Sequence, residues 1–310
     1  MTGRRHEGAA WLALFRLPNL LTLPGDVLAG ALLATGGVLH APLITGAVIS
    51  ASFCLYGAGL VFNDWVDLEE DRRARPDRPI PSGAVPPRNA LRMGFVLLAA
   101  GILLPLLAGI AASICAILLA GAVLAYNFLT KRQRLAAALN MGLCRGLNLS
   151  LGAAAATAVS PIDTPPSLLI WAACLVTVYI AAVTWLAHKE TEGGYRSWEG
   201  WLPAAVSVIG LAAYFTISTP AHLLQWAVFA LSWVAFLTVC IGASVRFSLA
   251  AGTNVSSIPP LIGKWIGALI PLQSALIVAS GPTPPNVALG AAVFCLWPLQ
   301  RRLARWFYSS

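Results

Sequence analysis

Stretches of about 20 predominantly apolar residues recur along almost the whole chain, and each is long enough to cross a membrane as a helix. Only 10% of the 310 residues are charged, whereas 58% are hydrophobic. A soluble domain carries about 25% charged residues, so this chain has too few to cover a surface that faces water. The same composition excludes a disordered, collagen-like or disulfide-stapled chain. The sequence therefore predicts an all-α protein, a polytopic transmembrane bundle of helices.

Ten helices are expected, in a single domain that spans residues 1–310. The third and fourth come from one apolar run, Met93–Tyr126, which is too long for a single crossing and which we fold at the small residues near 109–113. The total falls to nine if the last pair forms one broken helix. The expected helices are 8–36, 42–63, 90–110, 111–128, 135–159, 167–187, 200–218, 222–245, 260–280 and 284–300.

The basic residues gather in every second connection between these helices. The alternate connections contain no Lys or Arg; they lie near 37–41, 110, 160–166, 219–221 and 281–283. By the positive-inside rule, both termini and all charged loops face the cytoplasm, as in a multi-pass protein of the inner membrane. The net charge of +8 reports this orientation and does not by itself indicate nucleic acid. The six scattered cysteines suggest neither a disulfide framework nor a zinc site.

The densest chemistry follows the second expected helix. If that helix continues, Asn63, Asp67 and Asp71 recur every four residues and share one stripe with Asp64. Carboxylates so close repel one another unless a cation lies among them, and Mg²⁺ is a natural occupant because it prefers oxygen ligands and shares its shell with phosphates. The following stretch, 72–83, adds guanidiniums that suit phosphate oxygens. The alternative is an ordinary solvated loop whose acids and bases pair with each other.

This stretch resembles a known family. Residues 63–83, NDWVDLEEDRRARPDRPIPSG, resemble the first aspartate-rich motif of the UbiA superfamily of intramembrane prenyltransferases, NDxxDxxxD followed by RPxPSG. Three further stretches are similar to that family: RLPNL at 16–20, YNFLTK at 126–131, and the glycine-rich segment 142–152. The segment GDVLAG at 25–30 and the extra last helix look closest to its EboC-like branch.

The resemblance implies a UbiA-like bundle of nine core helices, here plus a tenth, around a central cavity. Cap loops are expected near 64–89, 129–134 and 188–199. The implied reaction is Mg²⁺-dependent transfer of a prenyl group from a prenyl diphosphate to an aromatic or other lipophilic acceptor among the membrane lipids. Asn63, Asp67 and Asp71 would hold Mg²⁺, Asp64 would support them, and Lys131 would contact the diphosphate. The implied catalytic residues are Asp64, Asp67, Asp71 and Lys131.

Further substrate contacts are suggested by side-chain chemistry. Arg72 and Arg78 are candidates for the diphosphate, since guanidiniums match its oxygens. Aromatic faces stabilise a carbocation by about 0.5–2 kcal/mol each, although tryptophans near helix ends are often interface anchors. The aromatic candidates are Trp65, Tyr126, Phe128, Tyr179 and Trp185. The full set of expected substrate-binding residues is Asn19, Asn63, Arg72, Arg78, Tyr126, Arg145, His188, Lys189 and Glu190.

The sequence departs from the family pattern after the sixth expected helix. The family has a second aspartate-rich motif there, but residues 187–196, AHKETEGGYR, contain no aspartate. Glu190 and Glu192 would replace part of that ligand set, and His188 or Lys189 would meet the diphosphate directly; a solvated loop is the alternative. Two-metal catalysis is therefore in doubt.

Arg145 is expected deep in the fifth helix, where a guanidinium needs a carboxylate, a diphosphate or water. Asp26 is a candidate partner, and an interhelical ion pair without substrate contact is the structural alternative. Gly142 and Gly146 have the spacing that allows close helix packing.

Two other functions stay open from the residues. One is a non-catalytic UbiA-like protein that binds or translocates a prenylated or aromatic lipid, which the altered loop motivates. The other is a CDP-alcohol phosphotransferase, which ranks last because its DGxxAR-type signature is absent.

Overall fold

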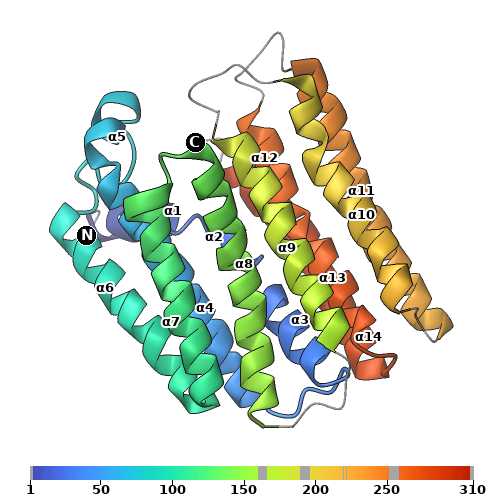
Figure 1. Cartoon of the computed structure of the whole chain (residues 1–310). Helices are drawn as coiled ribbons and strands as arrows, with labels where there is room; N and C mark the ends of the chain where they lie inside the picture. Colours follow the sequence, from blue (N-terminus) through green and yellow to red (C-terminus); the bar gives the residue numbers. More distant parts are fainter. Residues whose placement is uncertain are drawn as a thin grey trace.

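The structure is a computed structural model that describes residues 3–159, 166–188, 196–218, 220, 222–250 and 258–307. All the regular elements in this part of the chain are helices, which confirms the all-α prediction (Figure 1). Eight of the described helical segments are long and apolar enough to cross a membrane. The expected cap position 188–199 is described only at His188 and from Arg196 onward, so Lys189 and Glu190 lie outside the described residues.

The first half of the chain places the charged loop between two long helices. Pro42 and Pro87 are the first residues of these helices. Proline is common at this position because the N–H groups of the first turn have no partner within the helix. Gly109, at φ 97°, separates the third crossing from the fourth, as the small residues predicted. The elements are α1 (Gly3–Leu14), α2 (Leu17–Leu20), α3 (Pro24–Ala34), α4 (Pro42–Val66), α5 (Leu68–Ala74), α6 (Pro87–Leu103), the 3₁₀ turn η1 (Leu104–Ala108), α7 (Ile110–Ala125) and the π-helical turn η2 (Tyr126–Thr130).

The second half completes the bundle. The elements are α8 (Arg134–Thr157), α9 (Pro166–Ala187), η3 (Ser197–Trp201), α10 (Leu202–Ile217), α11 (Leu223–Ala250), α12 (Pro259–Gly267), α13 (Leu269–Ala279) and α14 (Pro284–Phe307). Figure 1 shows α5, α12 and both termini at one end of the bundle. The described parts of the loops that carry the basic residues meet at this end, which we call the charged end.

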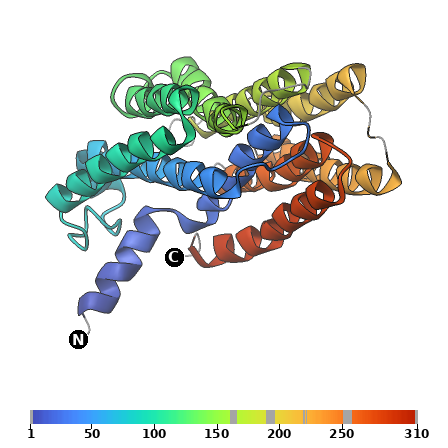
Figure 2. The ribbon, with the colours of Figure 1, turned by 90° about the horizontal axis from the view of Figure 1, so that it is seen from below.

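The prediction of one continuous first helix over 8–36 is wrong. The helix breaks at Arg16, which has left-handed φ 46° and ψ 57°, and α1 leans out of the bundle (Figure 2). Two prolines explain the interruption, because Pro18 and Pro24 each lack the N–H that a continuous helix would use. Each proline instead lies in the first turn of a new helix, α2 or α3. The segment 260–280 is likewise divided at Ala268 into α12 and α13.

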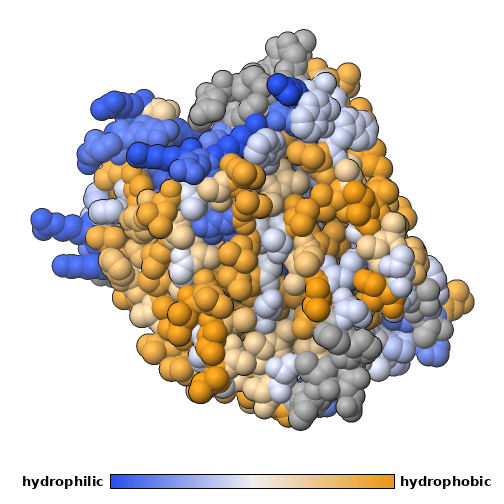
Figure 3. Space-filling view, in the orientation of Figure 1, coloured by the Kyte–Doolittle hydropathy of each residue, from blue (hydrophilic) through white to orange (hydrophobic). Residues whose placement is uncertain are grey.

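Two crossings form the centre of the bundle. The segment Pro259–Ala279 has 83% of its most apolar window buried, and Leu17–Ala34 has 72%, whereas Pro87–Ala108 has only 22%. Helix α13 is therefore enclosed by protein, and α6 faces outward. Figure 3 shows the outward face as mostly hydrophobic, with hydrophilic residues gathered over the charged end near α5. This is the distribution expected of a bundle in a bilayer.

Glycines bring α8 very close to its two main neighbours, α9 and α3. A methyl group on Gly142 or Gly146 would overlap Thr177 of α9, which confirms the packing predicted from their spacing. On the other face, a methyl group on Gly152 would overlap the backbone carbonyl of Val27 in α3. Helix α8 is thus held tightly in place, and its first residue lies at the charged end.

Candidate active site

The aspartate-rich stretch lies where α4 meets α5, at the charged end. Helix α4 ends at Val66, and Asp67 at φ −85° and ψ 4° separates it from α5. The backbone N–H of Asp67 still donates to Asn63 at 3.0 Å, and that of Asp71 donates to Asp67 at 2.8 Å. The four-residue repeat therefore survives the local break, and the predicted stripe is formed.

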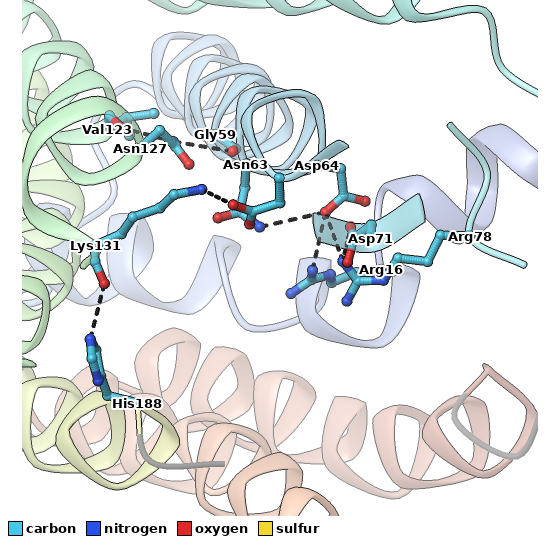
Figure 4. A network of polar contacts seen from close by, with 11 residues as sticks. Arg16, Gly59, Asn63, Asp64, Asp71, Arg78, Val123, Asn127, Lys131 and His188 are labelled. Atoms are coloured by element: carbon cyan, nitrogen blue, oxygen red, sulfur yellow. Dashed lines mark hydrogen bonds and ion pairs between the residues drawn. The ribbon is translucent and has the colours of Figure 1, made fainter. Parts of the chain in front are cut away.

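Arg78 joins two of these carboxylates. Its Nη1 donates to Asp71 at 2.6 Å and lies 3.7 Å from Asp64, with both carboxylates nearly buried at 4% and 5% exposure (Figure 4). The loop after α5 folds back so that this guanidinium returns to the stripe. Ile80 and Val85 are buried in a small apolar cluster with Val61, which anchors the return. Arg78 thus has the position expected of a residue of this site.

Arg16 is a member of this group that the sequence prediction missed. Its Nη2 donates to Oδ1 of Asp64 at 3.4 Å, and the Asn63 amide reaches the same oxygen at 3.5 Å (Figure 4). The left-handed backbone of Arg16 is costly for a non-glycine residue and typically persists at functional positions. A charged residue inside an otherwise apolar segment was the available signal.

Lys131 reaches the stripe from the opposite side. Its Nζ donates to Oδ1 of Asp67, and the Lys131 side chain is 13% exposed. The π-helical turn η2 carries it there, and Asn127 fixes this turn by donating to Gly59 of α4 at 3.2 Å. Tyr126 starts the same turn and is half-buried. A π-helical turn of this kind often marks a functional position.

His188 lies beside Lys131 but contacts its backbone. The Nε2 of His188 is 3.0 Å from the Lys131 carbonyl oxygen, so the ring N–H donates to that carbonyl (Figure 4). His188 therefore fastens the loop that carries Lys131 to the end of α9. Its expected direct contact with a diphosphate stays a prediction.

Arg72 is not brought into the group. It pairs with Glu69 on the exposed side of α5, and both lie next to Trp65 and Phe128 in a cavity that opens to the surface. This face of the helix is adjacent to the aspartate stripe, not part of it. The structure thus separates Arg72 from Arg78, although the sequence suggests the same role for both.

Arg145 forms an interhelical ion pair with Asp26, the structural alternative to a substrate contact. Its Nη1 donates to Asp26 at 2.7 Å and to the Thr22 carbonyl at 2.9 Å, and Asp26 is fully buried. Asn148 and Gln273 also donate to Asp26, at 3.2 Å and 2.6 Å. Helices α3, α8 and α13 are therefore joined deep in the bundle. Asn19, also buried, lies one turn before Thr22, whose hydroxyl donates to its carbonyl at 2.7 Å.

Three of the five aromatic candidates have other partners, and Phe128 packs against Phe62 with 6.1 Å between the ring centroids. The Tyr179 hydroxyl donates to the Trp265 carbonyl at 2.8 Å inside the core, so Tyr179 packs as a core residue. The Trp185 ring lies under the Arg134 guanidinium, 3.7 Å from its carbon to the ring centroid. Tyr179 and Trp185 therefore each have a structural contact within the protein.

The donor set of the stripe fits a hard divalent cation in part. It offers carboxylate and amide oxygens, and in this structure three cationic side chains pair with the carboxylates. Among the described residues, no three His, Cys, Asp or Glu side chains are close enough to form a metal site by themselves. An ion held here would therefore complete its shell with water and substrate phosphate, as Mg²⁺ characteristically does.

Residues 26–252 match the model of the UbiA prenyltransferase family. The chain belongs to this family. This UbiA chain is 29% identical over 249 residues to digeranylgeranylglyceryl phosphate synthase of Halobacterium salinarum, covering 79% of this chain and 87% of the relative. A synthase of the same name from Methanothrix thermoacetophila is 43% identical over 83 residues, which cover 27% of this chain and 29% of the relative. The predicted class, a UbiA-type prenyltransferase, is confirmed.

Solved structures show the same fold. A UbiA homologue from Aeropyrum pernix superimposes with a TM-score of 0.61 at 18% identity, over 84% of this chain and 97% of the homologue. A UbiA homologue from Archaeoglobus fulgidus bound to DMAPP and Mg²⁺ gives a TM-score of 0.57 at 12% identity, over 92% and 99% of the two chains. At these identities the similarity establishes the UbiA fold of the bundle.

Proposed function

We propose that this UbiA chain transfers a prenyl group from a prenyl diphosphate to a lipophilic acceptor within the membrane, with Mg²⁺ as cofactor. The observation that carries the proposal is the stripe of carboxylates at the end of α4, which three cations from three other parts of the chain surround. Structural contacts alone would not require so many paired charges at the border of an apolar bundle. The A. fulgidus homologue, bound to DMAPP and Mg²⁺, supports this assignment.

The residues of the site would act on the leaving group. Breaking the allylic C–O bond leaves negative charge on the diphosphate and positive charge on the prenyl carbon. Arg16, Arg78 and Lys131 would bind and orient the diphosphate oxygens, and preorganised charges of this kind stabilise the transition state by several kcal/mol. Bound Mg²⁺, with ligands from Asn63, Asp67 and Asp71, would neutralise further charge on the leaving group. Asp64 would keep Arg16 and Arg78 in place.

The acceptor is the less constrained substrate. The curated relatives are named as synthases of digeranylgeranylglyceryl phosphate, so a glyceryl phosphate lipid is one candidate acceptor. An aromatic lipid, one of the acceptor classes that the UbiA resemblance implies, is the other. The site lies at the charged end, which we place in the cytoplasm because of its basic loops.

A transfer assay tests this proposal. The purified full chain in lipid nanodiscs is given Mg²⁺, a labelled prenyl diphosphate, and either a geranylgeranylglyceryl phosphate or an aromatic acceptor. We expect labelled lipid and released diphosphate from the wild type, and loss of about 100-fold or more in rate from Asp67→Asn and from Asp71→Asn. Glu70→Gln removes an exposed carboxylate from the same stretch and is the matched control.

The acceptor that yields labelled lipid identifies the substrate class. No product with either acceptor, together with no diphosphate release and no difference between wild type and the two asparagine variants, would refute the enzymatic proposal. Binding of prenyl diphosphate without turnover would instead favour the non-catalytic lipid-binding function.

A further inference from the structure

A second buried charge cluster lies across the charged end from the aspartate stripe. Arg134 is the first residue of α8, and its Nη2 donates to Glu199 of η3 at 2.8 Å. Its Nε donates to the Trp185 carbonyl at 3.0 Å, and its guanidinium stacks on the Trp185 ring. Neither residue is among those that the sequence predicts for the site.

The carboxylate of Glu199 is fully engaged within the protein. Its Oε1 accepts from Arg134 and, at 3.2 Å, from Trp185 Nε1, while Oε2 accepts from the Arg196 backbone N–H at 3.0 Å. Glu199 is only 3% exposed. A buried carboxylate with this many donors is held in one orientation, and so is the arginine that it contacts.

Arg134 is linked to Lys131 by a very short connection. The two residues are three apart, and the Gln133 N–H donates to the Thr130 carbonyl at 2.9 Å, which closes the turn. On the far side, His188 fixes the Lys131 backbone. The loop that presents Lys131 to Asp67 is therefore fastened at one end by Arg134 and in its middle by His188.

We propose that Glu199 is a positioning residue, which acts through Arg134 to hold Lys131 against Asp67. The geometry assigns no direct substrate contact to Glu199. Through Arg134, Glu199 instead fixes the first residue of α8, and thereby the position of Lys131, whose side chain reaches the stripe. The importance of Lys131 for diphosphate binding rests on the proposed function, whereas its placement by Glu199 does not.

Lysine labelling tests the placement without any substrate. The full chain in nanodiscs is treated briefly with an amine-acylating reagent, and mass spectrometry measures the modification of Lys131, with the exposed Lys264 as internal reference. Glu199→Gln keeps the shape of the side chain but weakens its hold on Arg134. We expect Lys131 to be labelled about threefold faster or more, because local opening exposes a group that is half-buried and paired.

Two further variants define the result. Arg134→Lys keeps the positive charge but loses the forked contact and the stacking, so it should accelerate labelling even if Glu199→Gln folds poorly. Arg132→Gln removes an exposed charge from the same loop and should leave Lys131 unchanged. Unchanged labelling in both Glu199→Gln and Arg134→Lys overturns the proposal, and so does an equal increase at Lys264, which would indicate general loosening.

Kinetics then separate positioning from a metal-binding role. Glu199→Gln should lower kcat/KM for the prenyl diphosphate about tenfold, with a fall in kcat, because Lys131 stabilises the charge that develops on the leaving group. In a Lys131→Met background the same substitution should change kcat/KM less than about twofold, because its effect passes through Lys131. A shifted Mg²⁺ requirement would instead make Glu199 a metal ligand. A wild type without transfer activity refutes the proposed function, while the labelling result still decides the placement.

Discussion

Three buried carboxylates of the bundle are each paired with a cation from a distant part of the chain. Asp64 meets Arg16, Asp26 meets Arg145, and Glu199 meets Arg134. Such pairs add little net stability, since removing two charges from water offsets most of their attraction. Breaking one is costly, because the remaining charge is left without a partner in an apolar surrounding. Replacing one residue of a pair should therefore cost much folding stability, whereas replacing both residues with apolar ones should cost little.

Arg145→Met should lower the free energy of unfolding by about 3–5 kcal/mol, since it leaves Asp26 buried without its cation. The double substitution Asp26→Leu with Arg145→Met removes both charges and should recover part of the loss. Unfolding by a denaturing detergent in mixed micelles measures both values. A double variant as unstable as Arg145→Met alone would show that the ion pair is not the source of the effect.

Arg78→Lys should reduce kcat/KM about tenfold, a change of about 1.4 kcal/mol in transition-state stabilisation. A lysine ammonium is a point charge and does not contact Asp64 and Asp71 together as the guanidinium does. Arg75→Lys, in the exposed part of the same loop, is the control. Equal kinetics for the two variants in the transfer assay would contradict the role of Arg78 as a joint partner of both carboxylates.

Helix α8 connects the chemistry of the charged end with the core. Its start carries Arg134, its middle carries Arg145, and its glycines allow contact with α9 and α3 along its length. The sequence predicted this helix and its glycine spacing correctly. It did not predict the break at Arg16. The apolar composition of residues 8–36 suggested one continuous helix, and the two prolines in this segment were given too little weight.

Gly152→Ala should destabilise the protein by about 1–3 kcal/mol, because the added methyl group meets the rigid backbone carbonyl of Val27. Gly121→Ala is the matched control: its methyl group would have no atom within 4 Å, and alanine favours a helix. The same detergent unfolding series compares them. If Gly121→Ala loses as much stability as Gly152→Ala, close packing of α3 and α8 is not the cause.

At the scale of the whole molecule, all the charged loops that the structure describes lie at one end of an apolar bundle (Figures 1 and 3). By the positive-inside rule we propose that this end faces the cytoplasm, and the candidate site is formed from the same loops. The proposed orientation and the proposed function thus depend on one set of residues. The substrates that carry phosphate would reach the site from the cytoplasmic side.

If the charged end faces the cytoplasm, as we propose, a green fluorescent protein fused after residue 310 should be fluorescent in bacterial cells, and alkaline phosphatase fused at the same position should be inactive. A phosphatase fusion in the connection between α13 and α14, near 281–283, should be active. Reversed activities at the two positions would contradict the orientation.

Hydrophobic periodicity was enough to predict most of the helices, and a spacing of four residues was enough to predict the aspartate stripe, because side chains four residues apart on a helix share a face. The family was predicted from the resemblance of sequence motifs. Local sequence patterns did not predict the contacts of Arg16 with Asp64 and of Arg134 with Glu199. These residues are separated by 48 and 65 positions, and no local rule relates them. Their distances depend on how whole helices pack, on the glycines that let α8 approach its neighbours and on the prolines that break the first crossing. Helical spacing is a property of the backbone, and the meeting of distant charges is a property of the packed bundle.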